Sequence, residues 1–288
     1  MNPDSVLRIE YEKVKQACST DYKSIDATKA IFELVAASLT FLKRSCKPIK
    51  LVSRVAGKEY FTFTNGTIVA RPANKRLFLR SVKTIKALWK DWLSGRITPE
   101  GFSMLSYTTA LAPCLAVELF DRQNKKGPAT YFECYIGHLF AKALGVNPTK
   151  AARLPIENRE VLMTMDFLID VGDKHRKIHL PVKMSTRERV VQAWAHQRLL
   201  DAAYGEKVYR GIMVLFSETK LDSRSLEVVE ICVPDQWVAY QTYLARMDRI
   251  YYFDMPERYR SLTETYPSVI AIKPFGDFFI EKEAVLYS

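Results

Sequence analysis

Two residues of opposite charge, Asp166 and Lys183, lie on neighbouring stretches with the composition of β-strands. The runs MDFLIDV and KIHLPVKM are rich in β-branched and apolar residues, and a Gly-Asp-Lys turn cluster separates them. If they pair as an antiparallel hairpin centred near Lys174 and His175, Asp166 lies opposite Lys183, with Cβ atoms roughly 5 Å apart on one face. A carboxylate and an ammonium so placed could hold a divalent metal and a phosphate side by side, as in a metal-dependent phosphodiesterase.

A second acid on the same strand, Asp170, competes with Asp166 for the role of metal ligand. Both carboxylates lie on one face of the expected strand, because they are four residues apart. In the expected register the partner of Asp170 is His179 and not a lysine. We therefore prefer Asp166.

A polar residue, Gln197, interrupts the apolar stripe of the helix expected after the hairpin. The stripe follows helical spacing and consists of Val190, Ala193, Trp194, Gln197, Leu200 and Tyr204. Burying an unpaired amide costs roughly 1 to 3 kcal/mol, so Gln197 needs a hydrogen-bond partner. A metal-bound water or the Lys183 ammonium would place it in an active site, whereas a backbone carbonyl would make it structural. Because hard cations prefer charged oxygens, a metal at this site needs another acid.

Glu133 is the candidate for that acid. The segment YFECYIGHLFAKALG is typical of a helix that ends at Gly145, with Pro148 as a stop signal beyond it. Glu133 shares a face with Ile136 and Phe140 and therefore points inward among apolar residues. The alternative is a glutamate at the rim of a helix N-terminus, which the helix dipole favours.

These residues resemble the PD-(D/E)XK nuclease superfamily and, within it, the type II restriction endonucleases. In that family an Asp on the first strand binds the metal and a Lys on the second orients water or stabilises phosphate charge, which matches Asp166 and Lys183. The acid expected two residues before the Lys is Pro181 here, so one metal ligand of the pattern is missing. The resemblance covers roughly residues 130 to 216.

The enzymes that cut around CCGG or CCNGG cores resemble this chain more closely. They also lack that acid, and they follow the Lys with a Ser/Thr-rich turn and an Arg-Asp/Glu-Arg triplet, which here is Arg187, Glu188 and Arg189. In several of them a Glu on the next helix restores the ligand, at the position of Gln197. The family also places a Glu from a preceding helix at its active site, which corresponds to Glu133.

The resemblance implies a fold, a cofactor and partners. The fold is α/β, a restriction-endonuclease-like core with a mixed central sheet flanked by helices, plus a mainly helical N-terminal region. The catalytic residues are Asp166, Lys183, Glu133 and Gln197, and Mg²⁺ is held by Asp166 and Glu133. The partners are double-stranded DNA, a second copy in a homodimer or higher homo-oligomer, and a DNA methyltransferase of the same restriction system.

The triplet has two interpretations. Ser185 to Glu188 has the Ser-x-x-Glu form of a capping box, so Glu188 could cap the following helix. Alternatively, Arg187 and Arg189 match the O6 and N7 acceptors of guanine, and Glu188 can accept from the amino group of cytosine. The second interpretation predicts a palindromic site that contains consecutive G·C pairs.

The positive charge of the chain is concentrated in one segment. Residues 41–100 contain 14 Lys or Arg against three acids, which accounts for the whole net charge of +11. Aromatic residues interleave this charge, namely Phe61, Phe63, Phe78 and Trp89. The pattern predicts a surface that follows a nucleic-acid backbone, with Lys75, Arg76 and Arg80 as contacts. A solvated basic face and a membrane surface are the alternatives.

Composition is that of an ordinary globular protein, with 48% hydrophobic residues. The N-terminus lacks the pattern of a secretory signal, and we find no apolar run long enough to expect a membrane span. The five scattered cysteines without CxxC spacing predict reduced thiols and no zinc site. We therefore expect a cytoplasmic protein.

The order of the expected elements predicts two regions, a helical and basic one over residues 1–125 and a catalytic domain over 126–288. We expect helices over residues 6–46 and a hairpin at Asn65-Gly66. A basic helix over 74–95, a buried helix interrupted near Pro113 and further strands from Val208 complete the pattern.

Three functions are compatible with these patterns. The first is a magnesium-dependent, sequence-specific DNA endonuclease of a restriction system. The second is a DNA-binding module without catalysis, which Pro181 and the neutral Gln197 would permit. The third is a repair or phage nuclease without strong sequence preference, which would have no need of the Arg187–Arg189 triplet.

Overall fold

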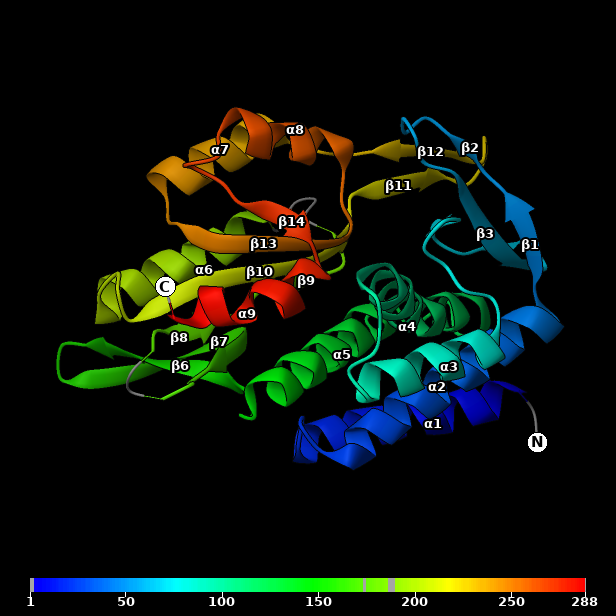
Figure 1. Cartoon of the computed structure of the whole chain (residues 1–288), viewed down its shortest axis with the longest axis horizontal. Helices are drawn as coiled ribbons and strands as arrows, with labels where there is room; N and C mark the ends of the chain where they lie inside the picture. Colours follow the sequence, from blue (N-terminus) through cyan, green and yellow to red (C-terminus); the bar gives the residue numbers. More distant parts are fainter. Residues whose placement is uncertain (1–2, 173–174, 186–189, 288) are drawn as a thin grey trace. The chain divides into compact units, whose positions relative to one another are not determined.

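The computed structural model describes residues 3–172, 175–185 and 190–287 and divides into two compact units (Figure 1). The first unit consists of Met1–His138 together with Thr219–Ile231, and the second of Leu139–Glu218 together with Cys232–Ser288. The functional division expected at residue 125 stays a prediction, because compactness alone does not assign a role to either part.

The first unit is mainly helical. Its helices are α1 (Pro3–Thr20), α2 (Ile25–Ser45), α3 (Val82–Leu93), α4 (Pro99–Phe120) and the larger part of α5 (Gly127–Leu144). Ser24 caps α2, because its side chain accepts from the N–H of Ala27. The basic helix expected from residue 74 begins only at Val82, where Ser81 caps it by accepting from Thr84.

Helix α4 continues through Pro113 without the interruption that we expected. Proline cannot donate to the carbonyl four residues earlier, which belongs to Thr109. The hydroxyl of Tyr131 donates to that carbonyl instead, at 2.8 Å, so the buried oxygen keeps a partner. This helix is long and apolar enough to cross a membrane, but 83% of its most apolar window is buried inside the fold, as expected for a core helix.

Short strands complete the first unit. One sheet consists of β1 (Lys47–Lys50), β3 (Tyr60–Asn65), β4 (Ile68–Val69) and β5 (Ala73–Asn74), and another of β2 (Val52–Ser53), β11 (Thr219–Asp222) and β12 (Glu227–Glu230). The expected hairpin is present, but its two-residue turn is Gly66-Thr67 and not Asn65-Gly66, because Asn65 still pairs with Ile68. Gly66 has a φ of 59° in this turn. All five cysteines of the chain are buried.

The described residues of the second unit form a mixed sheet, as expected. Its strands are β6 (Thr149–Ile156), β7 (Arg159–Ile169), β8 (Lys177–His179), β9 (Val182–Lys183), β10 (Tyr209–Ser217), β13 (Met247–Asp254) and β14 (Ile272–Pro274). They lie in the order β14-β13-β10-β8-β7-β6, and β9 also pairs with β10. The pairs β6–β7 and β7–β8 are antiparallel. Strand β10 pairs in parallel with β8, β9 and β13, and β13 pairs in parallel with β14.

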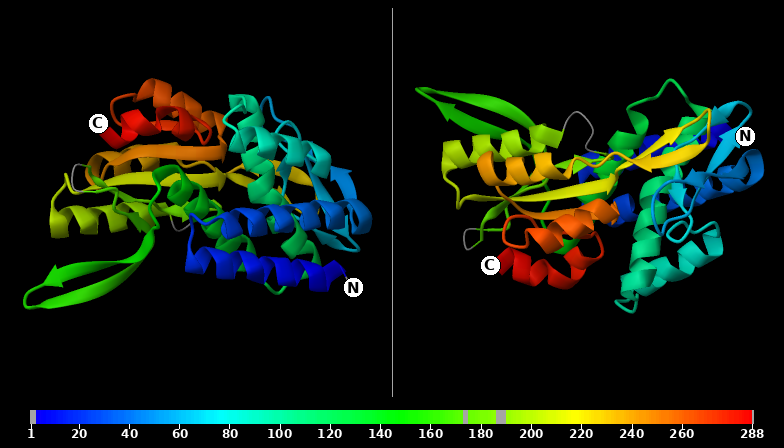
Figure 2. Two further views of the ribbon diagram at one scale, coloured as in Figure 1. Left: turned by 60° about the horizontal axis from the view of Figure 1, so that its bottom comes forward. Right: turned by 90° about the horizontal axis from the view of Figure 1, so that it is seen from above.

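Helices cover the central strand β10, all nine residues of which are buried. On one face, α6 (Val190–Tyr204), α7 (Pro234–Tyr243) and α8 (Glu257–Thr265) pack through Trp194, Trp237 and Tyr259. On the other face, Phe278 of α9 (Asp277–Tyr287) packs against Tyr251 and Phe140. The hairpin of β6 and β7 extends beyond this layered body (Figure 2).

Candidate active site

Asp166 lies on the long strand β7, and Lys183 lies on the short strand β9. The pairing of β7 with β8 places Leu168 opposite His179, so the register differs by two residues from the one that we expected. Asp166 and Lys183 are therefore not directly opposed, and that expectation is wrong. The turn between β7 and β8 sets this register, since the shift is already present at Leu168 and His179. Pro181 then has no N–H to donate: β8 ends before it, and β9 continues beside β10 instead.

The two side chains nevertheless meet. The ammonium Nζ of Lys183 lies 2.7 Å from Oδ2 and 3.0 Å from Oδ1 of Asp166. The backbone N–H of Val182 donates to the same Oδ2 at 2.8 Å, which fixes the orientation of the carboxylate. The side chains of Lys183 and Asp166 are 23% and 20% exposed, so the pair is reachable from solvent. A carboxylate and an ammonium thus share one partly open site.

A buried chain of hydrogen bonds lies behind this pair. Nδ1 of His179 and Oε1 of Gln197 are 3.0 Å apart, and Nε2 of Gln197 donates to Oδ1 of Asp201 at 2.8 Å. Because the amide nitrogen faces a carboxylate, the amide oxygen faces His179, which must donate through Nδ1. Burial lowers the pKa of His179 to about 4, so the ring is neutral at pH 7. Its Nε2 is buried and has no hydrogen-bond partner among the described residues.

A glycine makes room for this chain. Gly211 pairs with His179 across β10 and β8. A Cβ at Gly211 would lie 2.9 Å from Oε1 of Gln197 and 2.3 Å from the sulfur of Met247. No larger residue fits without moving the amide, so the position of Gln197 depends on the bare backbone at this point.

His196 is a site residue that sequence reasoning missed. Its ring centroid lies 6.2 Å from that of His179. Burial lowers the pKa of the half-buried His196, while the charges of Asp166 and Lys183 act on it in opposite directions. The available signal was its position beside Gln197, at the edge of the buried stripe of α6.

The other predicted ligands have different surroundings. Asp170 forms an ion pair with Lys177 at 2.6 Å, and that contact lowers its pKa. Its expected pairing with His179 is wrong for the same register reason. Glu133 is half-buried in the part of α5 that belongs to the first unit, whereas Asp166 belongs to the second. Its role as a ligand stays a prediction.

Gln197 is buried, as its place in the apolar stripe predicted. Of the partners that we considered, a backbone carbonyl is present, because its Nε2 lies 3.4 Å from the oxygen of Tyr209. Its stronger contacts are the two side chains His179 and Asp201. Its role in catalysis stays a prediction.

The carboxylate of Asp166 is suited to binding a magnesium ion. Within the described ranges, no three His, Cys, Asp or Glu side chains gather closely enough to enclose a metal. Mg²⁺ does not need such a cage, because it keeps several waters and takes one or two carboxylates together with substrate phosphates. Asp166 therefore fits as the carboxylate of a magnesium site that the substrate would complete.

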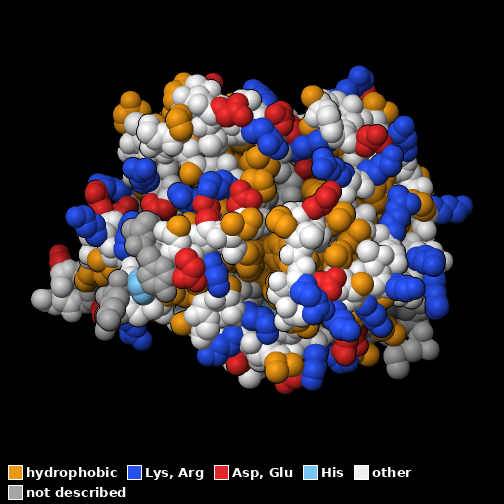
Figure 3. Space-filling model, in the orientation of Figure 1, with side chains coloured by type: hydrophobic (Ala, Val, Ile, Leu, Met, Phe, Trp, Pro, Cys, Tyr) orange, Lys and Arg blue, Asp and Glu red, His pale blue; other side chains and the backbone are white. Residues whose placement is uncertain are grey.

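The predicted DNA contacts Lys75, Arg76 and Arg80 are exposed on the segment between β5 and α3. Lys75 pairs with Glu59 at 2.6 Å, and Arg76 lies 3.9 Å from Glu100. Lys and Arg side chains gather over β1 and α3, where they are blue in Figure 3. A basic surface is thus present on the first unit, and its use as a DNA contact stays a prediction.

The aromatic residues of the basic segment do not belong to that surface. Phe61, Phe63 and Phe78 form a cluster of edge-to-face and tilted contacts and are 5%, 5% and 6% exposed. Trp89 is also buried. They form core, so they do not lie on a nucleic-acid-binding face. Arg80 connects the basic surface with this core, because its guanidinium lies 4.2 Å from the ring centre of Phe61.

The predicted base-reading triplet, Arg187, Glu188 and Arg189, lies outside the described residues. Helix α6 is described from Val190 onward. Both interpretations of the triplet, as a reader of G·C pairs and as a helix cap, stay predictions.

Comparisons with known proteins give one close structural likeness. No protein-family model matches the sequence, and no curated protein matches it either. The crystal structure of the type IIP restriction endonuclease Kpn2I superposes with a TM-score of 0.80 at 24% identity, covering 96% of this chain and 97% of that one. A complex of the restriction endonuclease PspGI with substrate DNA has a TM-score of 0.47 at 18% identity, covering 70% of this chain and 89% of that one. The chain therefore has the fold of a restriction endonuclease, with a mixed sheet at its centre.

Proposed function

We propose that this protein is a magnesium-dependent, sequence-specific endonuclease that hydrolyses phosphodiester bonds of double-stranded DNA. The observation that carries the proposal is the contact of Asp166, on β7, with Lys183, on β9, in the central sheet. The fold that it shares with Kpn2I over nearly the whole chain supports the proposal. The net charge of +11 also favours a polyanionic partner.

The residues of the pair have distinct tasks in this reaction. Asp166, with Glu133 as the second proposed acid, would hold Mg²⁺, which supplies Lewis-acid stabilisation and an activated water. Lys183 already lies at the carboxylate, so a phosphate that binds there meets its ammonium, which stabilises the negative charge that develops during hydrolysis. Val182 keeps the Asp166 carboxylate in place through its N–H. The water oxygen bonds to phosphorus, the bond to the sugar oxygen breaks, and that oxygen takes up the proton.

The proposed specificity is a palindrome with at least two consecutive G·C pairs, read by Arg187, Glu188 and Arg189. Its support is chemical: two guanidiniums and a carboxylate match the edges of guanine and cytosine in the major groove. Replacing Arg189 by Ala should cost roughly 1 to 3 kcal/mol of discrimination at those pairs and leave binding to random DNA nearly intact. A mapped cleavage site made only of A·T pairs would contradict the assignment.

The same proposal includes a cellular context. A palindrome presents two equivalent half-sites, which a symmetric homodimer or higher homo-oligomer matches. An enzyme of this kind works in the cytoplasm beside a DNA methyltransferase that protects the same sequence. Light scattering of the full chain, with and without a duplex carrying the site, tests the oligomer.

A DNA-binding module without catalysis is the second candidate. One observation favours it, namely that Gln197 directs its amide to His179 and Asp201 and not to the Lys183 pair. Phage DNA incubated with the protein, with and without magnesium, separates the candidates. Discrete fragments that need magnesium support restriction, a smear indicates cleavage without sequence preference, and intact DNA with a gel shift indicates binding alone.

A further inference from the structure

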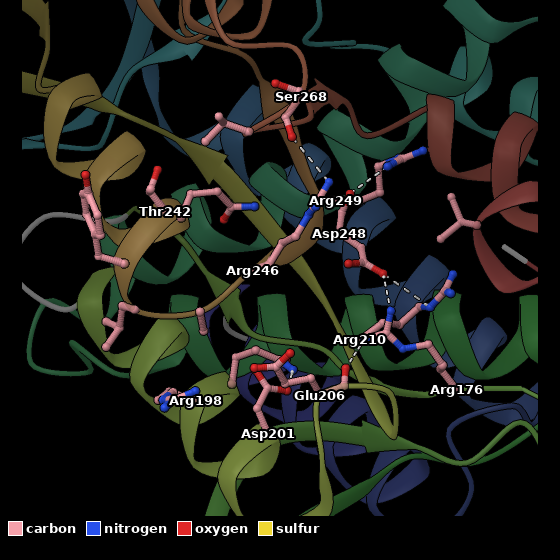
Figure 4. A pocket seen from close by; sticks show the side chains of 17 residues that line it. Arg176, Arg198, Asp201, Glu206, Arg210, Thr242, Arg246, Asp248, Arg249 and Ser268 are labelled. Carbon is pink, nitrogen blue, oxygen red and sulfur yellow. Dashed lines mark hydrogen bonds and ion pairs between the residues drawn. The ribbon is translucent and has the colours of Figure 1, made fainter.

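A polar cavity lies at the edge of the second unit's sheet, where strands β10 and β13 begin (Figure 4). Its volume is about 920 Å³, and every described residue that lines it belongs to the second unit. Helix α6 contributes Arg198 and Asp201, and the end of α7 together with the segment after it contributes Thr242 to Arg246. Gln197 also lines the cavity, whereas the Asp166–Lys183 pair does not.

Positive charge dominates the lining. Among the described residues it contains five arginines, which are Arg176, Arg198, Arg210, Arg246 and Arg249, and three carboxylates, which are Asp201, Glu206 and Asp248. Arginine stays protonated in proteins, so the lining keeps its excess of positive charge at every working pH.

Two of the arginines share one carboxylate. Asp248 lies 3.1 Å from Nη1 of Arg176 and 3.6 Å from Nε of Arg210, as the dashed lines of Figure 4 show. Arg210 is only 2% exposed. The pKa of Arg210 is lowered, and burial is the largest cause. The carboxylate of Asp248 raises this pKa, whereas the charges of Arg176 and Arg249 lower it further. The charges of Arg176 and Arg249 thus act against that of Arg210, although Arg249 also pairs with Glu281 at 3.2 Å, and an anion beside Arg210 would offset them.

Two further arginines at the rim are available to a ligand. Arg198 and Arg246 are exposed, and neither forms an ion pair with a carboxylate in the described parts of the chain. The guanidinium of Arg246 lies 3.4 Å from the backbone oxygen of Ser268 (Figure 4), which is a long contact. Tyr243 also lines the cavity and is 88% exposed.

We propose that this cavity, the arginine pocket, binds a phosphate group of a nucleotide. Guanidinium forks match phosphate oxygens in paired, charge-assisted hydrogen bonds, which a cavity with several arginines can supply repeatedly. The exposed ring of Tyr243 gives a base a surface for stacking. The volume falls within the range of roughly 300 to 1,000 Å³ of small-molecule sites. The phosphate comes either from a free nucleotide or from the backbone of a DNA strand.

The arginine pocket is separate from the Asp166–Lys183 pair. Arg210 pairs with Ile178, whereas Lys183 pairs with Leu215, five positions further along β10. At about 3.3 Å per residue, these positions are roughly 17 Å apart. A phosphate in the pocket is therefore a different group from the phosphate that the pair would cleave.

The test compares two double variants of the full chain with equal loss of charge. Arg198→Gln with Arg246→Gln removes the two rim arginines and leaves the buried Arg210 in place, so the fold is kept. Arg258→Gln with Arg260→Gln removes two exposed arginines of the same unit from α8, outside the lining. Calorimetric titrations use pyrophosphate, deoxyadenosine 5′-monophosphate and a short DNA duplex, all with EDTA, so that the result does not depend on cleavage.

The rim variant should bind pyrophosphate about tenfold more weakly than the parent, whereas the α8 variant should stay within about twofold, because only the former loses charge-assisted hydrogen bonds to the anion. If the mononucleotide behaves like pyrophosphate and duplex affinity is unchanged, the source is a free nucleotide. If only duplex affinity falls, with a weaker salt dependence, the source is a DNA strand. Equal affinities of both variants for every probe, or binding of no probe, overturn the proposal.

Discussion

At the scale of single residues, Gln197 holds two neighbours in fixed orientations. Its oxygen accepts from His179, and its nitrogen donates to Asp201. This polarity can be read only from the structure, because the sequence shows merely a polar residue in an apolar stripe. The same contacts explain why a neutral side chain suits this position, since a carboxylate here would face the carboxylate of Asp201 directly.

We therefore expect Gln197→Glu to destabilise the protein. Two carboxylates would lie at about the 2.8 Å that now separates Nε2 of Gln197 from Oδ1 of Asp201, and burial already raises the pKa of Asp201. Urea denaturation at pH 8 should show a loss on the order of 1 to 3 kcal/mol, which Asp201→Asn in the same chain largely restores. Unchanged stability together with faster magnesium-dependent cleavage would instead place this position at the metal.

His179 makes stability depend on pH. Its pKa is lowered from 6.5 to about 4 in the folded protein, so the unfolded chain takes up the proton first as the pH falls. The free energy of unfolding should therefore be unaffected by this residue above pH 6.5 and fall by about 3 kcal/mol as the pH approaches 4. Denaturation curves of the parent and of His179→Asn at several pH values measure the difference. Parallel pH profiles would mean that the ring is not buried as described.

The contact between Asp166 and Lys183 could be predicted from the sequence, but the strand register that brings them together could not. Residue type and spacing were enough to predict that Asp166 and Lys183 approach each other, and their contact is confirmed. The register depended on the turn between β7 and β8, and a shift of two residues gave Asp170 the partner Lys177. Long side chains tolerate such a shift, which is why Lys183 still reaches Asp166.

At the scale of elements, the middle of α4 depends on a residue of another helix. Tyr131 of α5 donates to the carbonyl of Thr109 that Pro113 leaves without an amide partner. Tyr131→Phe should therefore cost about 1 to 3 kcal/mol, the effect of leaving a buried carbonyl unpaired. In a Pro113→Ala chain, which has the missing N–H again, the same change should cost less. A double-mutant cycle by thermal denaturation measures this coupling, and additive losses would contradict it.

Helices were easier to predict than their surroundings. The apolar stripe of α6 follows from spacing alone, and its buried residues confirm it. The basic segment misled in two ways: its helix α3 begins at Val82, and its phenylalanines are core. Alternating charge and aromatics are compatible with a binding face and with a strand that has one buried side, and only tertiary packing separates the two.

At the scale of the whole molecule, the positive charge of residues 41–100 should govern affinity for DNA. Replacing Lys75, Arg76 and Arg80 by Gln should weaken specific and random duplexes about equally, because phosphates are the same in both. The slope of log affinity against log salt should fall by about 0.9 for each phosphate that the variant no longer neutralises. Replacing Lys13, Lys15 and Lys29, which lie outside the segment, is the control with equal charge. Equal slopes for both triple variants would show that the segment is merely solvated.

The central claim is that Asp166 and Lys183 form the catalytic pair of a DNA endonuclease. The most direct measurement is single-turnover cleavage of plasmid DNA with magnesium by the parent, Asp166→Ala and Lys183→Ala, with DNA affinity and thermal stability measured on the same preparations. Asp170→Ala serves as the control, since its carboxylate pairs with Lys177. We expect both variants of the pair to bind DNA normally and to lose several orders of magnitude in rate, because metal and charge stabilisation supply several kcal/mol. A rate within about tenfold of the parent, which is a barrier change of only roughly 1.4 kcal/mol, would contradict the claim.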